Sequence, residues 1–165
     1  MNKAFFVVGN FGVGKSTIIS DEIISKQDIF LKVGNNTWVV GNNINGMDSL
    51  VETKKELVIQ KIIKNNDKNL IICGIYYSQL KDIDRLKPYF DIVIIYLKTS
   101  FENNVDRILK RGKNINVKTY NEKLKSHLSL LKYARGKAKI YIIDNNREQS
   151  ETKKDYQKIV YYEKN

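Results

Sequence analysis

The stretch from Gly9 to Thr17 has the residue types and the spacing to bind a triphosphate. It reads Gly-Asn-Phe-Gly-Val-Gly-Lys-Ser-Thr, which fits the phosphate-loop pattern G-x-x-x-x-G-K-S. Glycines let the backbone turn tightly, so that several N–H groups converge on phosphate oxygens at the positive end of the following helix. In this pattern the lysine reaches the β- and γ-phosphates, and the serine hydroxyl is a ligand of Mg²⁺. We therefore predict a nucleotide site made by Gly9, Gly12, Val13, Gly14, Lys15, Ser16 and Thr17, with Ser16 on the metal and Thr17 near the α-phosphate.

The residues around this loop supply the strand and the helix that it needs. Residues 4–8 form a continuous apolar run, typical of a strand buried on both faces. From Lys15 to about Lys26, isoleucines recur at helical spacing at 18, 19, 23 and 24. Strand, glycine loop and helix is the context that the motif requires. The alternative is a chance glycine turn before a surface helix.

Length and composition indicate one domain over residues 1–165. The chain has a single proline, Pro88, and no run rich in glycine and serine that would mark a linker. No apolar run approaches the roughly 20 residues that span a bilayer, and we expect neither a secretory signal nor a membrane partner. One cysteine, Cys73, suits a reducing cytoplasm and forms no disulfide or metal cluster.

Positive charge is concentrated between Val105 and Lys139. This segment carries a net charge of +9 out of +11 for the whole chain. Such a local field attracts polyanions, either a nucleotide triphosphate or a nucleic-acid backbone. The alternative is an ordinary solvated surface in a chain rich in lysine.

The rest of the chain alternates between predicted strands and helices. Four more strands are expected at 37–40, 70–73, 91–97 and 140–143, with helices at about 48–63, 78–87, 101–111 and 120–131. Residues 27–36 are interpreted as a polar connection, and a polar tail with a short docked helix is expected after about residue 146. Alternation of this kind predicts an α/β fold with a doubly wound, five-stranded parallel sheet. Its ligand would bind beyond the carboxyl ends of the strands, where the phosphate loop lies.

Over residues 3 to about 145 the chain resembles the small P-loop kinases of the nucleoside-monophosphate and shikimate kinase type. The likeness rests on the phosphate loop and on residues 93–100, which are followed by Arg107 and Arg111 as Arg-x-x-x-Arg. It implies a three-layer fold with strand order 2-3-1-4-5, and a short lid at about 112–119. It also implies that Arg107 and Arg111 contact ATP or its transferring phosphoryl group, since guanidinium groups clamp phosphate oxygens.

A narrower resemblance is to phage P-loop kinases that phosphorylate 5-hydroxymethyldeoxyuridine in DNA. It is carried by Val39-Val40-Gly41 and then by Gly46-Met47-Asp48-Ser49, about a dozen residues in all. It implies DNA as the carrier of the acceptor and, for a phage-encoded chain, the host cytoplasm as the location.

One departure from these kinases concerns the metal. They usually carry an acidic residue near the end of the third strand, and this chain has Cys73 there, followed by Gly74. A thiol does not replace a hard carboxylate toward Mg²⁺. Either Asp48 takes over through a water molecule, or the metal is held more weakly.

A second departure concerns the acceptor. Monophosphate kinases clamp the acceptor phosphate with arginines, but residues 38–74 contain none and only Arg85 remains as a candidate. This favours a hydroxyl acceptor, for which Asp48 is the proposed base, its alternative role being a helix N-cap. By position the acceptor site is expected at Gly46, Asp48, Tyr76 and Tyr77. The two tyrosines would stack on a base or else pack at the core edge. Trp38 is expected in the core, and His127 is expected to be packed or at the surface rather than catalytic.

Three functions remain open at this point. The first is an ATP- and Mg²⁺-dependent kinase that transfers the γ-phosphoryl group to a hydroxyl, with a hydroxymethyl-pyrimidine in DNA as the preferred acceptor. The second is a nucleoside or deoxynucleoside-monophosphate kinase. The third is a nucleotide-binding module without catalysis, which the missing third-strand carboxylate keeps open.

Overall fold

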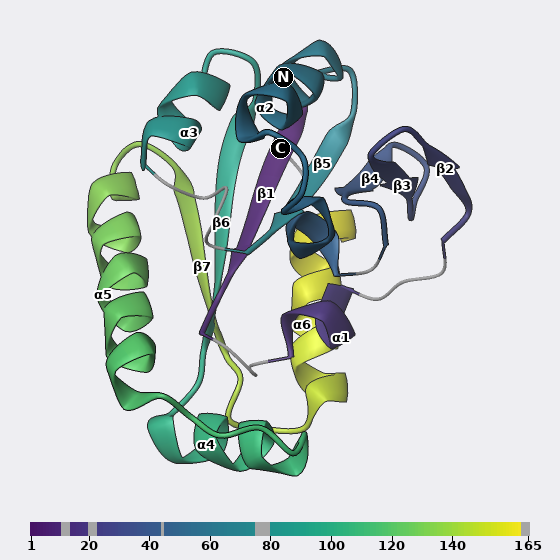
Figure 1. Ribbon diagram of the computed structural model, residues 1–165. Coiled ribbons are helices and arrows are strands. Elements are labelled where there is room, and N and C mark those ends of the chain that lie inside the picture. The colour runs from purple at the N-terminus through teal and green to yellow at the C-terminus, as the bar shows by residue number, and fades with distance from the viewer. Residues whose placement is uncertain (11–13, 20–22, 44, 75–79, 163–165) are drawn as a thin grey trace.

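The computed structural model describes residues 1–10, 14–19, 23–43, 45–74 and 80–162 (Figure 1). The strands are β1 (Lys3–Val8), β2 (Ser25–Gln27), β3 (Phe30–Lys32), β4 (Thr37–Val40), β5 (Asn69–Cys73), β6 (Asp91–Lys98) and β7 (Lys139–Asp144). The helices are α1 (Lys15–Ile19), the 3₁₀ helix η1 (Gly46–Leu50), α2 (Lys55–Lys64), α3 (Leu80–Leu86), α4 (Phe101–Lys110), α5 (Val117–Ala134) and α6 (Gln149–Tyr162).

The strands form one mixed sheet in the order β2-β3-β4-β5-β1-β6-β7. The five strands from β4 to β7 in this order are parallel, whereas β2 and β3 are antiparallel to their neighbours. The prediction of a sheet of five parallel strands is therefore wrong in number and in orientation. The five predicted strands are all present, and their order, counted along the chain, is the expected 2-3-1-4-5.

The two additional strands form a hairpin in the segment that was interpreted as helix end and polar connection. Residues 25–27 are Ser-Lys-Gln, all exposed, and carry no apolar signal. The turn is made by Asp28, whose φ of 53° is the one positive φ of a non-glycine residue in the described part of the chain. Pairing then extends backward, because the Ile24 N–H donates to the carbonyl of Lys32. The helix predicted through Lys26 is therefore wrong at its end.

Helices cover both faces of the sheet, which gives three layers (Figure 1). On one face α2, α3 and α5 pack against Ala4, Phe6 and Val8 of β1. On the other face α1 and α6 pack against Phe5 and Val7. Since successive strand residues point to opposite faces, one apolar run serves both layers.

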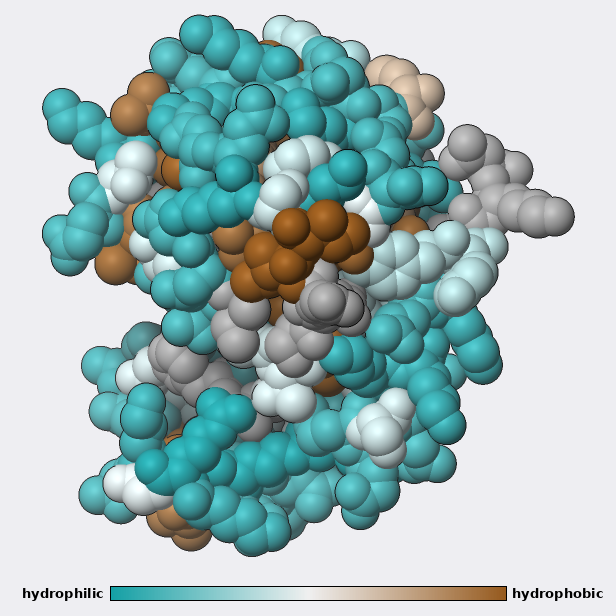
Figure 2. All heavy atoms as spheres, turned by 90° about the vertical axis from the view of Figure 1, so that its right-hand side faces the viewer, coloured by the Kyte–Doolittle hydropathy of each residue, from teal (hydrophilic) through white to brown (hydrophobic). Residues whose placement is uncertain are grey.

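The segment after residue 146 belongs to this second layer. Tyr156 of α6 is completely buried and Val160 is nearly so, next to Ile18 and Ile19 of α1. The expected docked helix is present, and it is longer than a short terminal turn. The surface on this side is mostly hydrophilic with a small apolar patch near the centre of the view (Figure 2).

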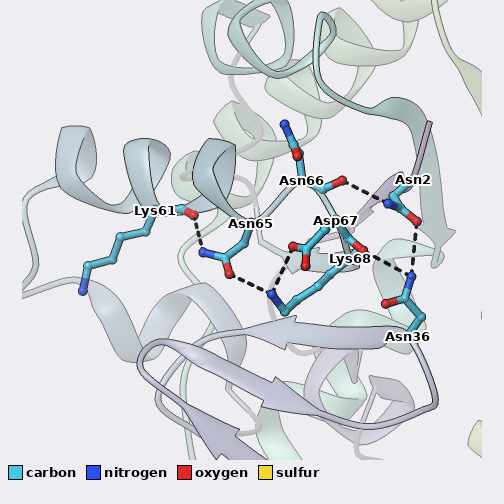
Figure 3. A network of polar contacts seen from close by, with 7 residues as sticks. All are labelled: Asn2, Asn36, Lys61, Asn65, Asn66, Asp67 and Lys68. Carbon is cyan, nitrogen blue, oxygen red and sulfur yellow. Dashed lines mark hydrogen bonds and ion pairs between the residues drawn. The ribbon is translucent and has the colours of Figure 1, made fainter.

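The end of the sheet that is remote from the phosphate loop is closed by a polar network (Figure 3). The Asn2 amide donates to the carbonyl of Asn66 at 3.0 Å, and Asn36 donates to the Asn2 side chain at 3.2 Å. The Lys68 ammonium donates to the side chains of Asn65 at 2.9 Å and Asp67 at 3.1 Å. These contacts tie β1, the β3–β4 turn and the α2–β5 turn together. This end of the sheet therefore stabilises the fold. Over the described residues, no helix is long and apolar enough to cross a membrane.

Candidate functional site

The phosphate loop follows β1, and α1 begins at Lys15, as the motif predicts. Gly14 has a φ of 87°, and a Cβ placed on it would lie 2.3 Å from an atom of the Gln149 side-chain amide. Glycine is favoured there because the backbone conformation is left-handed. Gly9 lies at the buried end of this strand, Ser16 is partly exposed and Thr17 is exposed. Gly12 and Val13 lie outside the described residues.

The Lys15 ammonium folds back over the loop. It donates to the carbonyl of Gly9 at 2.8 Å and to that of Asn10 at 3.1 Å. Burial lowers its pKa, the nearby Asp48 carboxylate raises it, and Arg111 lowers it. Cys73, Asp48 and Arg111 come from three different segments, and all lie near this ammonium. The loop is therefore the point where β5, η1 and the end of α4 converge.

A tight glycine contact brings η1 to this point. A Cβ on Gly41 would lie 2.3 Å from the carbonyl oxygen of Gly46, and a Cβ on Gly46 would lie 3.0 Å from the Cβ of Cys73. The chain after β4 is thus folded directly against the end of β5. Cys73 is a small buried residue within this contact, and burial raises its pKa to about 11. Its thiol is therefore protonated at pH 7.

Asp48 is exposed on η1, next to the end of β5. Its Oδ1 would be 3.5 Å from a Cβ placed on Gly74, the residue after Cys73. The single helix predicted for about 48–63 is two helices, η1 and α2, and the N-cap residue of α2 is Lys54. Asp48 therefore does not cap α2, which removes the alternative that the sequence left open for it. Instead, the carboxylate lies within contact distance of the backbone that follows β5.

Arg107 and Arg111 have different surroundings. The Arg107 guanidinium donates to the carbonyl of Asn145 at 2.7 Å and to that of Arg147 at 3.3 Å. Turned toward Arg107, the Gln149 amide oxygen also accepts from it at 3.1 Å. Arg107 thus joins α4 to the β7–α6 loop, beside Gly14. Arg111, one turn later, is the arginine whose charge acts on Lys15.

The expected lid is a short loop after α4. Gly112, with a φ of 70°, ends the helix, and the Lys113 N–H donates to the carbonyl of Ile108 at 3.2 Å, as in a Schellman cap. Helix α5 already begins at Val117, so the loop is shorter than the expected range of 112–119. A cavity of about 300 Å³ lies beneath it, lined by Ile108, Arg111, Lys113, Asn114, Ile115, Asn116, Thr119 and Tyr120.

Helix α5 contributes two residues that the sequence analysis did not place at the site. Its first turn is held to the phosphate loop, because the buried amide of Asn10 donates to the carbonyl of Tyr120 at 3.1 Å. The pKa of Lys123 is lowered by burial and by the charge of Lys15, and is raised by Asp48. Lys123 therefore faces the same centre. Helical spacing is the sequence signal that could have found Lys123. It lies three residues after Tyr120 and four before His127, so the three side chains share the inward side of the helix.

His127 is buried against the ring of Tyr96, with 6.0 Å between ring centroids. Neither ring nitrogen has a hydrogen-bond partner among the described residues. Burial, followed by the charge of Lys15, lowers its pKa to about 4. The ring is therefore neutral at pH 7, and its burial decides for packing between the two positions, packed or surface, that the sequence left open.

This lowered pKa predicts an acid-sensitive fold. The unfolded chain takes up a proton near pH 6.5 and the folded chain only near pH 4, so stability is lost as pH falls through this window. We expect the free energy of unfolding to fall by about 2 kcal/mol between pH 7 and pH 5 from this group alone. Urea unfolding at both pH values, compared with His127→Leu, measures it. An equal fall in both proteins would contradict the assignment.

Few side chains are available as metal ligands, and those near the phosphate loop offer oxygen atoms, which are hard ligands. No group of three His, Cys, Asp or Glu side chains that could hold an ion exists in the described part of the chain. The Ser16 hydroxyl and the Asp48 carboxylate offer oxygen atoms beside the phosphate loop, and oxygen suits Mg²⁺. The residues fit a metal that is held mainly by nucleotide phosphates.

Helices α2 and α3 are joined by two ion pairs. Arg85, the remaining candidate for a phosphate clamp, forms a bidentate pair with Glu56 at 2.7 and 2.8 Å on the surface. Beside this pair, Lys55 and the buried Asp82 lie 2.6 Å apart. Tyr76 and Tyr77 lie outside the described residues. Arg85 is thus engaged in holding the two helices together.

Comparison with known proteins gives likenesses of fold only. No family model matches the chain. No curated protein matches it in sequence either. A deoxyadenosine kinase from M. mycoides with bound dCTP has a TM-score of 0.53 and 17% identity, over 97% of this chain and 100% of that one. A gluconokinase from Sinorhizobium meliloti 1021 has a TM-score of 0.50 and 13% identity, over 97% and 96%. Together with the phosphate loop, the sheet order and the helical layers, these likenesses show that the chain has the fold of a P-loop kinase.

Proposed function

We propose that this protein is an ATP-dependent kinase that transfers the γ-phosphoryl group to a hydroxyl. The observation that carries the proposal is the convergence on the phosphate loop of Lys15, Arg111 and Lys123, with the Asp48 carboxylate beside them. Three cations match the charge of a transferring phosphoryl group, and one exposed carboxylate is available for a proton. A module that only binds nucleotide has no need of that carboxylate.

The residues then have separate roles. The backbone of the loop holds the triphosphate, and Lys15 exchanges the carbonyls of Gly9 and Asn10 for phosphate oxygens. The acceptor oxygen attacks the γ-phosphorus, its proton passes to Asp48, and the bond from the γ-phosphorus to the β–γ bridging oxygen breaks. Mg²⁺, which Ser16 and Asp48 would help to hold, offsets phosphate charge when bound. Arg107 positions the β7–α6 loop, and Arg111 contacts the transferring group.

The engagement of Arg85 favours a hydroxyl acceptor over a monophosphate. A phosphate clamp needs a guanidinium group that is available to the acceptor, and the one arginine considered for this role is paired with Glu56. Within the hydroxyl class we propose a hydroxymethyl-pyrimidine carried in DNA, because the chain has a strong positive charge close to the site. Gly46 and the two tyrosines at 76 and 77 complete the proposed acceptor pocket.

A free deoxynucleoside is the second candidate acceptor, since it presents a hydroxyl without a phosphate. One protein of the same fold is a deoxyadenosine kinase. Transfer of label from γ-labelled ATP distinguishes the candidates when it is tested with hydroxymethyl-pyrimidine DNA, unmodified DNA, free nucleosides and monophosphates. Label in modified DNA alone supports the proposal, whereas label in monophosphates contradicts the hydroxyl assignment. Nucleotide binding without transfer to any acceptor contradicts the kinase.

Lys123 provides a test of the convergent charges. Lys123→Gln is expected to lower the rate of transfer roughly tenfold or more, because it removes one cation from the phosphoryl group. The matched control is Lys125→Gln, a change of the same type two residues later on the exposed side of the helix. Steady-state transfer to a free small-molecule acceptor measures both variants. Equal rates for the two variants would exclude Lys123 from the site.

A further inference from the structure

Helix α5 carries a row of three exposed lysines on the side opposite to its buried face. Lys118, Lys125 and Lys132 are seven residues apart and all are exposed. Seven residues are two turns of helix, so the side chains lie in one line with a rise of about 10.5 Å between them. We call these three residues the lysine row.

The lysine row points away from the core. The inward residues of the same helix, Tyr120, His127, Leu130 and Ala134, are all buried. Lys123, which faces the phosphate loop, belongs to this inward side. One helix therefore presents cations to the candidate site at one face and to solvent at the other.

The chain segments on either side of the row are strongly positive, and the Asp84 carboxylate of α3 meets the helix at Tyr133. Exposed Lys113 lies in the loop before the helix, and exposed Arg135 and Lys137 follow its end. Glu122 is the one acidic residue between positions 107 and 143 of the sequence. The charge thus extends from the lid loop along the whole helix without a compensating acidic cluster.

This arrangement fits a phosphodiester backbone better than a membrane surface. The rise of about 10.5 Å between lysines is roughly three times the 3.4 Å rise per nucleotide of a stacked strand. A helix that lies in a membrane interface turns a broad apolar face outward. In α5 the apolar face is covered by the sheet, and Leu128 is the one large apolar side chain with high exposure between Lys118 and Lys132.

We propose that the lysine row binds the backbone of a nucleic-acid strand and leads it toward the lid loop and the phosphate site. The inference deepens the proposed function, on which it rests, because it names the surface that would hold an acceptor carried in DNA. The first turn of α5 is held to the phosphate loop through Asn10, so a strand on the row is tied to the site by a fixed element.

The test is binding of a fluorescent 20-nucleotide single strand, followed by anisotropy over a salt series without ATP. The variant is Lys118→Glu/Lys125→Glu/Lys132→Glu. Its matched control reverses three exposed lysines elsewhere, Lys64, Lys154 and Lys158, so both have the same net charge. We expect the row variant to lose at least about tenfold in affinity, and its slope of log K against log salt to fall by about 2. The control should lose less than about threefold.

Two further sets of measurements separate a loss of binding from a loss of folding and identify the kind of ligand. The triple glutamine variant of the same three lysines should show a smaller loss in the same direction, with thermal unfolding checking that each variant is folded. Duplex DNA and single-stranded RNA distinguish the kind of strand, and vesicles with phosphatidylserine test the membrane. Equal losses in variant and control, or binding to vesicles but not to oligonucleotides, would overturn the proposal.

The outcome is separable from that of the proposed function. If the strand binds through the lysine row and no acceptor is phosphorylated, the nucleic-acid proposal is supported and the kinase proposal is contradicted. If a free hydroxyl substrate is phosphorylated and no oligonucleotide binds at low salt, the kinase proposal is supported and the nucleic-acid proposal is contradicted.

Discussion

Lys15→Ala is expected to reduce phosphoryl transfer by about 10²- to 10³-fold or more while the protein stays folded. The ammonium lies close to the charges of Arg111 and Asp48, and it is held over the loop by the carbonyls of Gly9 and Asn10. Its loss removes the point charge on the transferring phosphates. Because burial already lowers the pKa of this lysine, removal of the charge costs the fold little.

Transfer rates, circular dichroism and the unfolding temperature measure this prediction together. Lys64→Ala, an exposed lysine on α2, is the matched control and should behave like the unchanged protein. A folded Lys15→Ala protein with normal transfer would falsify the assignment of the phosphoryl-transfer site to Lys15 and its loop. A loss of transfer with nucleotide binding retained would assign the lysine to the chemical step.

Asp48→Asn should lower turnover about 10²-fold or more with nucleotide binding near normal. The carboxylate lies beside Gly74 at the end of β5 and does not cap α2, so little stability depends on it. Asparagine keeps the shape but accepts no proton. If the carboxylate also helps to hold the metal, the Mg²⁺ concentration for half-maximal rate should rise in the same variant.

A titration of Mg²⁺ at saturating ATP separates the two roles of Asp48. A rate that recovers at high Mg²⁺ indicates a metal role, and a rate that stays low indicates a base. Asp67→Asn, which changes an exposed carboxylate at the remote end of the sheet, is the control. Unchanged turnover at every Mg²⁺ concentration would remove the only base named for a hydroxyl acceptor.

The local pattern of apolar residues and glycines in the sequence was sufficient to predict much of the fold. The apolar run before Gly9 and the glycine–lysine motif after it predicted β1, the loop and the start of α1. The strand order was implied by the resemblance to P-loop kinases, and the sheet has it. The hairpin at 25–32 was not predicted, since Ser25–Gln27 is exposed and polar and becomes a strand only by pairing with β3.

The same division applies to the candidate site. By itself the sequence determined which residues could hold a triphosphate, because the motif is local and its spacing sets the geometry of one loop. Only the tertiary structure decided where Asp48 lies, because that depends on Gly41 and Gly46 closing against the end of β5. It likewise decided that Arg107 is bonded to the β7–α6 loop and that Lys123 faces Lys15. Such contacts join residues far apart in the chain, and they are set by how helices pack on a sheet rather than by any local pattern.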